Sequence, residues 1–408
     1  MTELDLTFVR AQFLAFSEPS LKDWSFFENA GGSYPARHTV DRLTEFYTRL
    51  KMQPYAPNPA STEAGQWMDD AHRRMAEWLC VETEEVMFGP STTANVYTLA
   101  HAFRDVMKAG DAVIVADQNH EANRGAWRRM AEMGVEVRDW NVDPETGLLN
   151  LEDLDNLLDD KTRVVAFPHC SNIVAATNPV AEICARAKAA GAATVVDGVS
   201  HAPHAMPDVG ALGCDVYLFS AYKTYGPHQG VMVVRGDLPM RLGNQGHDFN
   251  AGLHSKRLTP AGPDHAQEAA MNGVADYLDA LDAHHFSASK PGGQRTNRLG
   301  DLMRAHEAKV LAPLLDYLRA RNDVRILGPA DPNLRVPTVA LACDRPGAEI
   351  ATEMVQHKVM CWGGDFYSRE LVQNMGVDPD HGALRLSFVH YTSAEEMDRA
   401  IKALDAVL

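Results

Sequence analysis

Short apolar segments alternate with longer segments of helical periodicity between about residues 90 and 235. Six apolar segments have the length and β-branched content of buried strands, at residues 111–116, 135–138, 163–167, 193–196, 215–219 and 231–234. Two segments between them predict helices that end at a glycine, 95–108 before Gly110 and 178–190 before Gly191. This alternation predicts an α/β fold with a mainly parallel central sheet and helices on both faces.

The pattern changes after the segment 260–263, which is rich in proline and glycine. Two long helical patterns follow, and after them short strands alternate with helices up to the C-terminus. We expect a smaller α+β domain there, and we expect four parts in the chain. Residues 1–25 form an N-terminal segment that packs with the small domain, and residues 26–262 form a large cofactor-binding domain. Residues 263–290 form a connecting helix, and residues 291–408 form the small domain.

Composition narrows the class of protein. A chain of 408 residues with 45% hydrophobic and 23% charged residues has a folded composition and enough apolar material for a large sheet. The formal net charge of −17 argues against nucleic acid or an anionic membrane as a partner. The six cysteines show no disulfide or metal-ligand spacing, and no secretory leader or membrane-spanning run is present, so we expect a soluble cytoplasmic protein.

Two polar residues at predicted strand ends suggest the chemistry. Asp197 ends the strand 193–196, and Lys223 lies in a turn after the strand that ends at Phe219. A carboxylate that keeps a pyridine nitrogen protonated, together with a lysine amine for an aldehyde, is what pyridoxal phosphate requires. Taken singly, each residue is more often a turn cap or a solvated turn residue, so the prediction rests on the pair.

Other candidates also follow strands or begin helices, where open α/β sheets bind their ligands. The segment 89–95, with small and hydroxyl residues before a helix, would bind the phosphate, although a simple N-cap is the alternative. Ser220 and Tyr222 could donate further hydroxyls to it, and His120 could stack on the ring. Asn172 could bond the ring oxygen, with Ser200 or His201 nearby.

A metal site is the main alternative, because His120, His169, His201 and His204 are possible ligands. We favour it less, since the proline between His201 and His204 disturbs helical spacing and no carboxylate or cysteine completes a standard pattern. We expect no metal.

These residues resemble the class V aminotransferase family of fold-type I pyridoxal phosphate enzymes, and within it the cysteine desulfurase-like branch. The similarity is carried by segments 27–33, 195–198, 220–227 and 384–387 and extends over nearly the whole chain. It implies that Lys223 forms the Schiff base, Asp197 pairs with the ring nitrogen and His120 stacks on the ring. It also implies that Thr93 and Ala94, with Ser220 and Tyr222, hold the phosphate, and that Asn172 faces the ring oxygen. Arg385 would bind a substrate carboxylate, and Gly31 and Gly32 would let the backbone approach the substrate.

The chain departs from the branch at three places. Phe366 stands where a desulfurase carries its nucleophilic cysteine, and Cys361 lies several residues upstream. Ser200 replaces the usual glutamine or histidine, and the segment 260–265 lacks the glycine-threonine pair that reaches a neighbouring subunit. Despite these departures, the resemblance implies a homodimer that acts on a small amino acid as a Cβ–S or Cβ–X lyase. Transamination, epimerisation and a catalytically silent binding protein stay open as alternatives.

Overall fold

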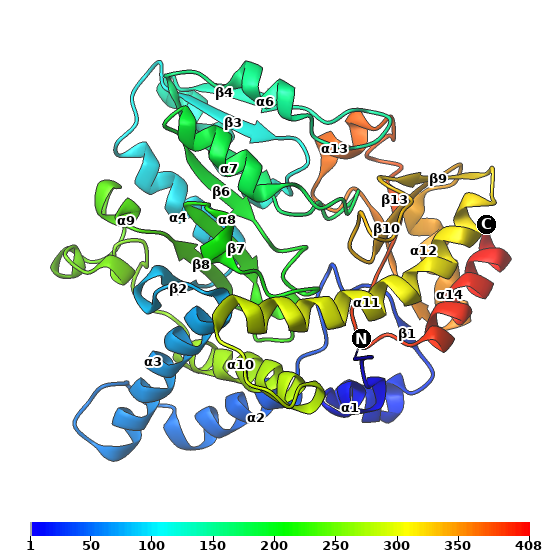
Figure 1. The fold of residues 1–408 in the computed structure, drawn as a ribbon, viewed down its shortest axis with the longest axis horizontal. Helices are drawn as coiled ribbons and strands as arrows, with labels where there is room; N and C mark the ends of the chain where they lie inside the picture. Colours follow the sequence, from blue (N-terminus) through cyan, green and yellow to red (C-terminus); the bar gives the residue numbers. More distant parts are fainter. Residues whose placement is uncertain (1) are drawn as a thin grey trace.

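The computed structural model describes residues 2–408, and its largest element is a seven-stranded sheet (Figure 1). The strand order is β2-β8-β7-β6-β5-β3-β4. In chain order, the strands are β2 (Val86–Gly89), β3 (Ala112–Ala116), β4 (Glu136–Trp140), β5 (Thr162–Pro168), β6 (Ala193–Asp197), β7 (Val216–Ser220) and β8 (Gly230–Val234). Strands β3 to β7 pair in parallel, which confirms the predicted fold class.

The strands at the β2–β8 edge of this sheet pair in antiparallel fashion. Strand β8 pairs antiparallel with both β7 and β2. The connection between β7 and β8 covers only residues 221–229, which is too short for a crossover to a parallel strand. The sheet is therefore mixed, and its short β2 lies outside the strands that the sequence predicted.

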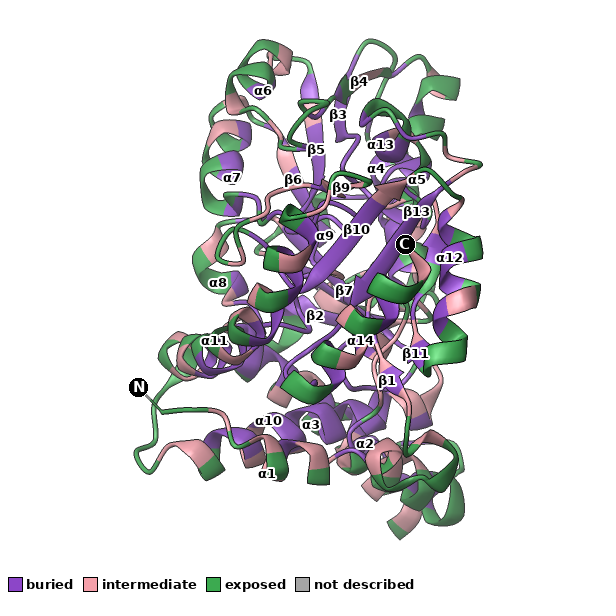
Figure 2. Ribbon diagram, turned by 90° about the vertical axis from the view of Figure 1, so that its right-hand side faces the viewer, coloured by how far each residue is buried: buried purple, intermediate pink, exposed green. Residues whose placement is uncertain are grey.

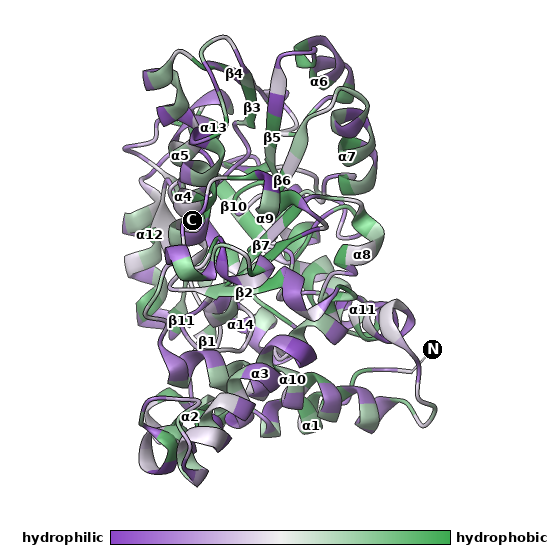
Figure 3. Ribbon diagram, turned by 90° about the vertical axis from the view of Figure 1, so that its left-hand side faces the viewer, coloured by the Kyte–Doolittle hydropathy of each residue, from purple (hydrophilic) through white to green (hydrophobic). Residues whose placement is uncertain are grey.

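Alternating side chains of these strands form two hydrophobic cores. Ile114, Val165 and Phe219 face one core, whereas their neighbours Val113 and Val164 face the other. The first core is covered by α3 (Pro59–Leu79), α7 (Val180–Ala189), α10 (His265–His285) and α11 (Gly292–Arg319), and the second by α4 (Thr92–Arg104), α5 (Gly125–Arg128) and α9 (Leu238–Arg241). Figure 3 shows hydrophobic strands between helices of mixed hydropathy.

A second, four-stranded antiparallel sheet lies in the C-terminal part. Its order is β12-β13-β10-β9, formed by β9 (Val324–Leu327), β10 (Thr338–Cys343), β12 (Trp362–Gly364) and β13 (Ala383–Ser387). It packs with α11, α12 (Gly347–Met354) and α14 (Ala394–Val407), and Figure 2 shows buried β10 and β13 behind the exposed side of α14. Near the N-terminus, β1 (Ser25–Phe26) pairs in parallel with β11 (Val359–Met360).

The remaining helices are α1 (Leu6–Ala11), α2 (Arg37–Glu45), α6 (Leu151–Leu157), α8 (Val209–Leu212) and α13 (Arg369–Asn374). Helix α11 runs from beside the large sheet to the small one (Figure 1). The domain boundaries near residues 25, 262 and 290 stay a prediction. Within residues 2–408, no helix combines the length and apolarity needed to span a membrane.

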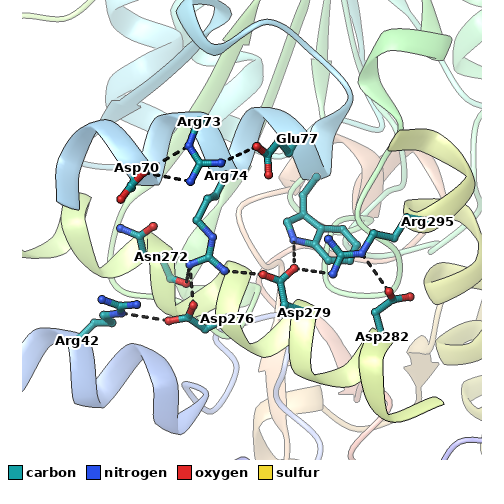
Figure 4. Close-up of polar contacts among 11 residues, drawn as sticks. Arg42, Asp70, Arg73, Arg74, Glu77, Asn272, Asp276, Asp279, Asp282 and Arg295 are labelled. Carbon is teal, nitrogen blue, oxygen red and sulfur yellow. Dashed lines mark hydrogen bonds and ion pairs between the residues drawn. The ribbon is translucent and has the colours of Figure 1, made fainter. Parts of the chain in front are cut away.

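Charged side chains join α2, α3, α10 and α11 on one side of the molecule (Figure 4). Arg74 of α3 contacts Asp276 and Asp279 of α10, each at 2.6 Å. Arg42 of α2 shares Asp276 at 3.1 Å, and Arg295 of α11 shares Asp279 at 2.6 Å. One chain of ion pairs thus joins α2 and α3 to α10 and α11, two helix pairs that are distant in sequence.

Candidate active site

Two adjoining cavities lie at the carboxyl ends of the parallel strands. The inner cavity has a volume of about 300 Å³, and the outer cleft about 890 Å³. They share the lining residues Thr93, His120, Ala122, Asn172, Tyr222 and Lys223. The topology therefore brings the residues predicted from separate strand ends to one place.

Asp197 and Lys223 both line the inner cavity. Asp197 is the last residue of β6, and its Oδ1 accepts a hydrogen bond from the N–H of Val199 at 2.9 Å. Burial raises the pKa of Asp197 to about 6. Lys223 ends a short helical turn after β7, and its Nζ makes no hydrogen bond or ion pair with residues 2–408. Burial, and then the charge of Arg385, lowers the pKa of Lys223 to about 8.

His120 follows β3 and lines both cavities. Its Nδ1 accepts the N–H of Ala122 at 3.0 Å, which leaves the proton of the neutral ring on Nε2. Burial, with the nearby charges of Lys223 and Arg385, lowers the pKa of His120 to about 3. The imidazole is thus neutral and held in one orientation at neutral pH.

The N-terminus of α4 faces the inner cavity through Ser91, Thr92 and Thr93. Thr92 and Thr93 have no intrahelical acceptor for their N–H groups, because they begin the helix. Their N–H groups and the positive end of the helix dipole suit a phosphate. Thr92 Oγ1 also lies 2.8 Å from Ser220 Oγ. Sequence reasoning missed Thr92, although it stands in the same hydroxyl-rich motif.

The predicted role of Ala94 at the phosphate stays a prediction. Ala94 lines neither cavity, and its N–H already donates to Ser91 Oγ at 3.1 Å, because Ser91 caps the helix. Ser200 and Tyr222 line the inner cavity. Tyr222 stacks on His228, with ring centroids 4.8 Å apart, and His228 is a cavity residue that the sequence did not indicate.

Asn172 connects the site to the loop 365–368. Its Nδ2 donates to the carbonyl of Phe366 at 3.0 Å, and its Oδ1 accepts from Ser368 Oγ at 2.8 Å. Phe366 and Tyr367 both have left-handed backbone conformations, with φ of 52° and 58°. Asn172 lines both cavities, so it stands between this strained loop and the predicted cofactor position.

Arg385 of β13 lines the outer cleft beneath the same loop. Its guanidinium carbon lies 3.8 Å from the centroid of the Phe366 ring. Its Nη2 pairs with Glu28 Oε1 at 2.8 Å, and its Nη1 donates to the carbonyl of Asn172 at 3.4 Å. Sequence reasoning placed Arg385 but missed Glu28, because nothing in the local sequence shows a contact that spans 357 positions.

The two glycines of the predicted substrate site, Gly31 and Gly32, differ in their position relative to the outer cleft. Gly31 lines the outer cleft, and a Cβ at this position would lie 2.6 Å from Glu28 Oε1. Gly32 does not line either cavity, and a Cβ there would meet Tyr222 at an ordinary 3.5 Å. The close approach at residue 31 therefore makes room for a side chain of this chain, Glu28.

His120 lies apart from the other three histidines of the alternative metal site. His169 and His201 stack with centroids 3.6 Å apart, and His201 and His204 line a different cavity from His120. His204 instead pairs with Glu307 at 3.1 Å. Among residues 2–408, no group of three His, Cys, Asp or Glu side chains is arranged to hold a metal ion.

The inner cavity fits pyridoxal phosphate in its donor set. It presents an amine that lacks a partner, a buried carboxylate, a neutral imidazole and the N-terminus of a helix. Each of these matches one requirement of the aldehyde, the ring nitrogen, the ring face and the phosphate.

Comparisons with known proteins agree with this fit. Residues 25–250 match the family model of class V aminotransferases. The chain is 31% identical to the aminotransferase-like protein FGM3 of Gibberella zeae, over 98% of each protein. It is 26% identical to a cysteine desulfurase of Pectobacterium carotovorum, over 98% of this chain and 97% of that protein.

A solved structure shows the same fold. The apo structure of cysteine desulfurase from Thermococcus onnurineus has a TM-score of 0.85 and 20% identity, with 100% of this chain and 99% of that chain covered. The predicted fold-type I architecture is thereby confirmed, as is the predicted family. The chain is a pyridoxal phosphate-dependent enzyme of the class V aminotransferase family.

Proposed function

We propose that the enzyme cleaves a Cβ–S or Cβ–X bond of a small amino acid without forming a persulfide on one of its own cysteines. The observation that supports the proposal is the position of Phe366, whose ring covers Arg385 in the loop that the resemblance aligns with the desulfurase thiol. The relatives named cysteine desulfurase support a substrate that resembles cysteine.

The surroundings of the cysteines support the proposal that no persulfide forms on the enzyme. In the part of the chain that the structure describes, Cys170 is the cysteine that lines the inner cavity, and none lines the outer cleft. Burial raises the pKa of the Cys170 thiol well above its usual range and that of Cys361 to about 12. Thiols of this kind are poor nucleophiles, because the reactive form is the thiolate.

We assign the roles from the geometry described above. When bound, pyridoxal phosphate supplies an aldehyde for the substrate amine and a ring that stabilises negative charge at Cα. Asp197 would keep the ring nitrogen protonated, His120 would lie against the ring, and Thr92, Thr93, Ser220 and Tyr222 would hold the phosphate. Lys223 Nζ, uncharged above its lowered pKa, accepts the proton from the substrate Cα. Arg385, which is paired with Glu28, would face the carboxyl group of the substrate.

One experiment tests the cofactor and the reaction together. The purified enzyme is expected to show the visible absorbance of lysine-bound pyridoxal phosphate, and Lys223→Ala is expected to lose it. With cysteine, a lyase releases pyruvate, ammonia and sulfide in equal amounts, and the sulfide release stays unchanged after Cys361→Ala. Conversion of the cofactor to its amine form without sulfide would instead indicate an aminotransferase.

The alternative of a catalytically silent binding protein predicts that the purified protein lacks this absorbance. A colourless protein that pyridoxal phosphate does not reconstitute would contradict the proposed activity.

We also propose that two copies of the chain associate and that the enzyme works in the cytoplasm. The six unpaired cysteines support a reducing compartment.

A further inference from the structure

The ion pair between Glu28 and Arg385 bears on which substrates this site accepts. Arg385 has a side chain that is only 4% exposed, and Glu28 contacts it at 2.8 Å. Both residues line the outer cleft. The guanidinium proposed for the substrate carboxylate thus already has a carboxylate partner within the chain.

The backbone fixes Glu28 in this position. Residue 28 forms a bridge with Ser387, two residues beyond Arg385 in β13, and the N–H of Asn29 donates to the carbonyl of Ser387 at 3.1 Å. The absence of a side chain at Gly31 leaves the space that Glu28 Oε1 occupies. The pair is therefore built into the fold and does not depend on a mobile side chain at the surface.

A substrate carboxylate at Arg385 would place two carboxylates beside one guanidinium. In a buried site, that arrangement leaves an uncompensated negative charge, which is unfavourable because little water screens it. An uncharged group of the same shape leaves the ion pair neutral.

Two buried atoms of the pair also lack partners. Arg385 Nε and Glu28 Oε2 make no hydrogen bond with residues 2–408. Nε–H is a donor and Oε2 is an acceptor. Both atoms are shielded from the cleft, so the ion pair between Arg385 Nη2 and Glu28 Oε1 is the contact that a substrate group meets.

We propose that Glu28 is a specificity-determining residue. By neutralising Arg385, it lowers the affinity of the outer cleft for a carboxylate relative to a neutral carboxamide or ester at the same position. The proposal rests on the proposed function for the place of the substrate, and it identifies amino acid derivatives with an uncharged carboxyl group as the favoured substrate class.

The test compares 3-phenylpropionate with 3-phenylpropionamide by ligand-observed NMR titration. Neither molecule has an amine, so neither reacts with the cofactor, and the measurement stays valid if the proposed reaction is wrong. The phenyl group suits the aromatic lining of the cleft, which includes Tyr97 and Trp362. We expect the wild type to bind the amide at least as tightly as the acid.

Glu28→Gln has the same shape and removes the charge. We expect it to shift the acid-to-amide affinity ratio toward the acid by about tenfold or more, equivalent to about 1.4 kcal/mol. Glu121→Gln is the matched control, because Glu121 lines the same cleft without contacting Arg385. We expect the control to change the ratio by less than about twofold, because rim charges act weakly.

A second measurement titrates the holoenzyme with L-phenylalanine and with L-phenylalanine amide. The change in cofactor absorbance reports the affinity for each. The proposal is overturned if the wild type prefers the acid about tenfold, equivalent to about 1.4 kcal/mol, or if both variants shift the ratio equally. It is also overturned if Glu28→Gln leaves the ratio unchanged in both comparisons.

Discussion

Lys223 and Arg385 are two cations that line the same buried cleft, and each makes the charged form of the other less favourable. Burial is the larger cause of the lowered pKa of Lys223, and Arg385 is the second. The lysine that must react with an aldehyde is therefore closer to its neutral form than a surface lysine.

This effect predicts a pH dependence. The rate at which the apoenzyme captures pyridoxal phosphate is expected to rise with pH, with a midpoint at about 8. Below this pH the amine is protonated and does not attack the aldehyde; above it the amine is neutral. Arg385→Gln is expected to move the midpoint upward, because it removes a positive charge that disfavours protonated Lys223. Stopped-flow absorbance measures both, and a wild-type midpoint near the ordinary value of 10.5 would contradict the prediction.

The residues that sequence reasoning found share a local signal. Asp197 and Lys223 each end an apolar strand, so their positions at the sheet edge follow from the strand pattern alone. The N–H of Ala94 is used by the Ser91 cap, which is the N-cap alternative that the sequence left open. Glu28 had no signal at all, since its role depends on β13, which is distant in sequence.

At the scale of elements, the side-chain amide of Asn172 makes two of the hydrogen bonds that hold the loop 365–368. Asn172 bonds the carbonyl of Phe366 and the hydroxyl of Ser368. Asn172→Ala is expected to lower the free energy of unfolding by about 1–3 kcal/mol, because it leaves these buried groups unpaired. Hydrogen exchange of the 366–368 amides should accelerate, while the exchange of α14 should not change. Unaltered exchange in the loop would show that Asn172 does not hold it.

The ion pairs that join the helices predict a second difference in stability. Arg74, 16% exposed, binds Asp276 and Asp279 across two helices, whereas Arg73, 50% exposed, binds Asp70 and Glu77 within its own helix (Figure 4). Arg74→Ala should lower the free energy of unfolding by about 1–3 kcal/mol. The control Arg73→Ala should change it by less than about 0.5 kcal/mol. Urea denaturation measures both, and equal losses would contradict the prediction.

Elements with strong periodicity were predicted better than those defined by pairing. The strand at 193–196 and the helix over 178–190 match β6 and α7 closely. The short strands β2 and β12, four and three residues long, carry too few residues to show a pattern. The antiparallel direction of β8 depends on the length of the preceding turn, which the strand pattern does not contain.

At the scale of the whole molecule, three of the exposed large apolar side chains lie between residues 240 and 253. Phe249 is 82% exposed, and Leu253 and Met240 are 54% and 46% exposed. Exposed aromatic side chains of this kind often anchor an interface. We expect a native mass of two chains in analytical ultracentrifugation and at least about a tenfold weaker association for Phe249→Ser, the loss typical of an aromatic anchor. A monomer at micromolar concentration would contradict the homodimer.

The left-handed conformation at Phe366 and Tyr367 also matters for how this fold can change. Asn172 and the N–H of Glu121 hold the loop through its main-chain carbonyls, while the buried Phe366 ring belongs to a hydrophobic cluster with Val142, Ile173 and Leu371. A phenylalanine in this left-handed conformation bears a cost of about 1–2 kcal/mol. Replacing it with cysteine would keep the main-chain contacts of the loop and bring a thiol beside Arg385, while removing the apolar packing that the ring provides.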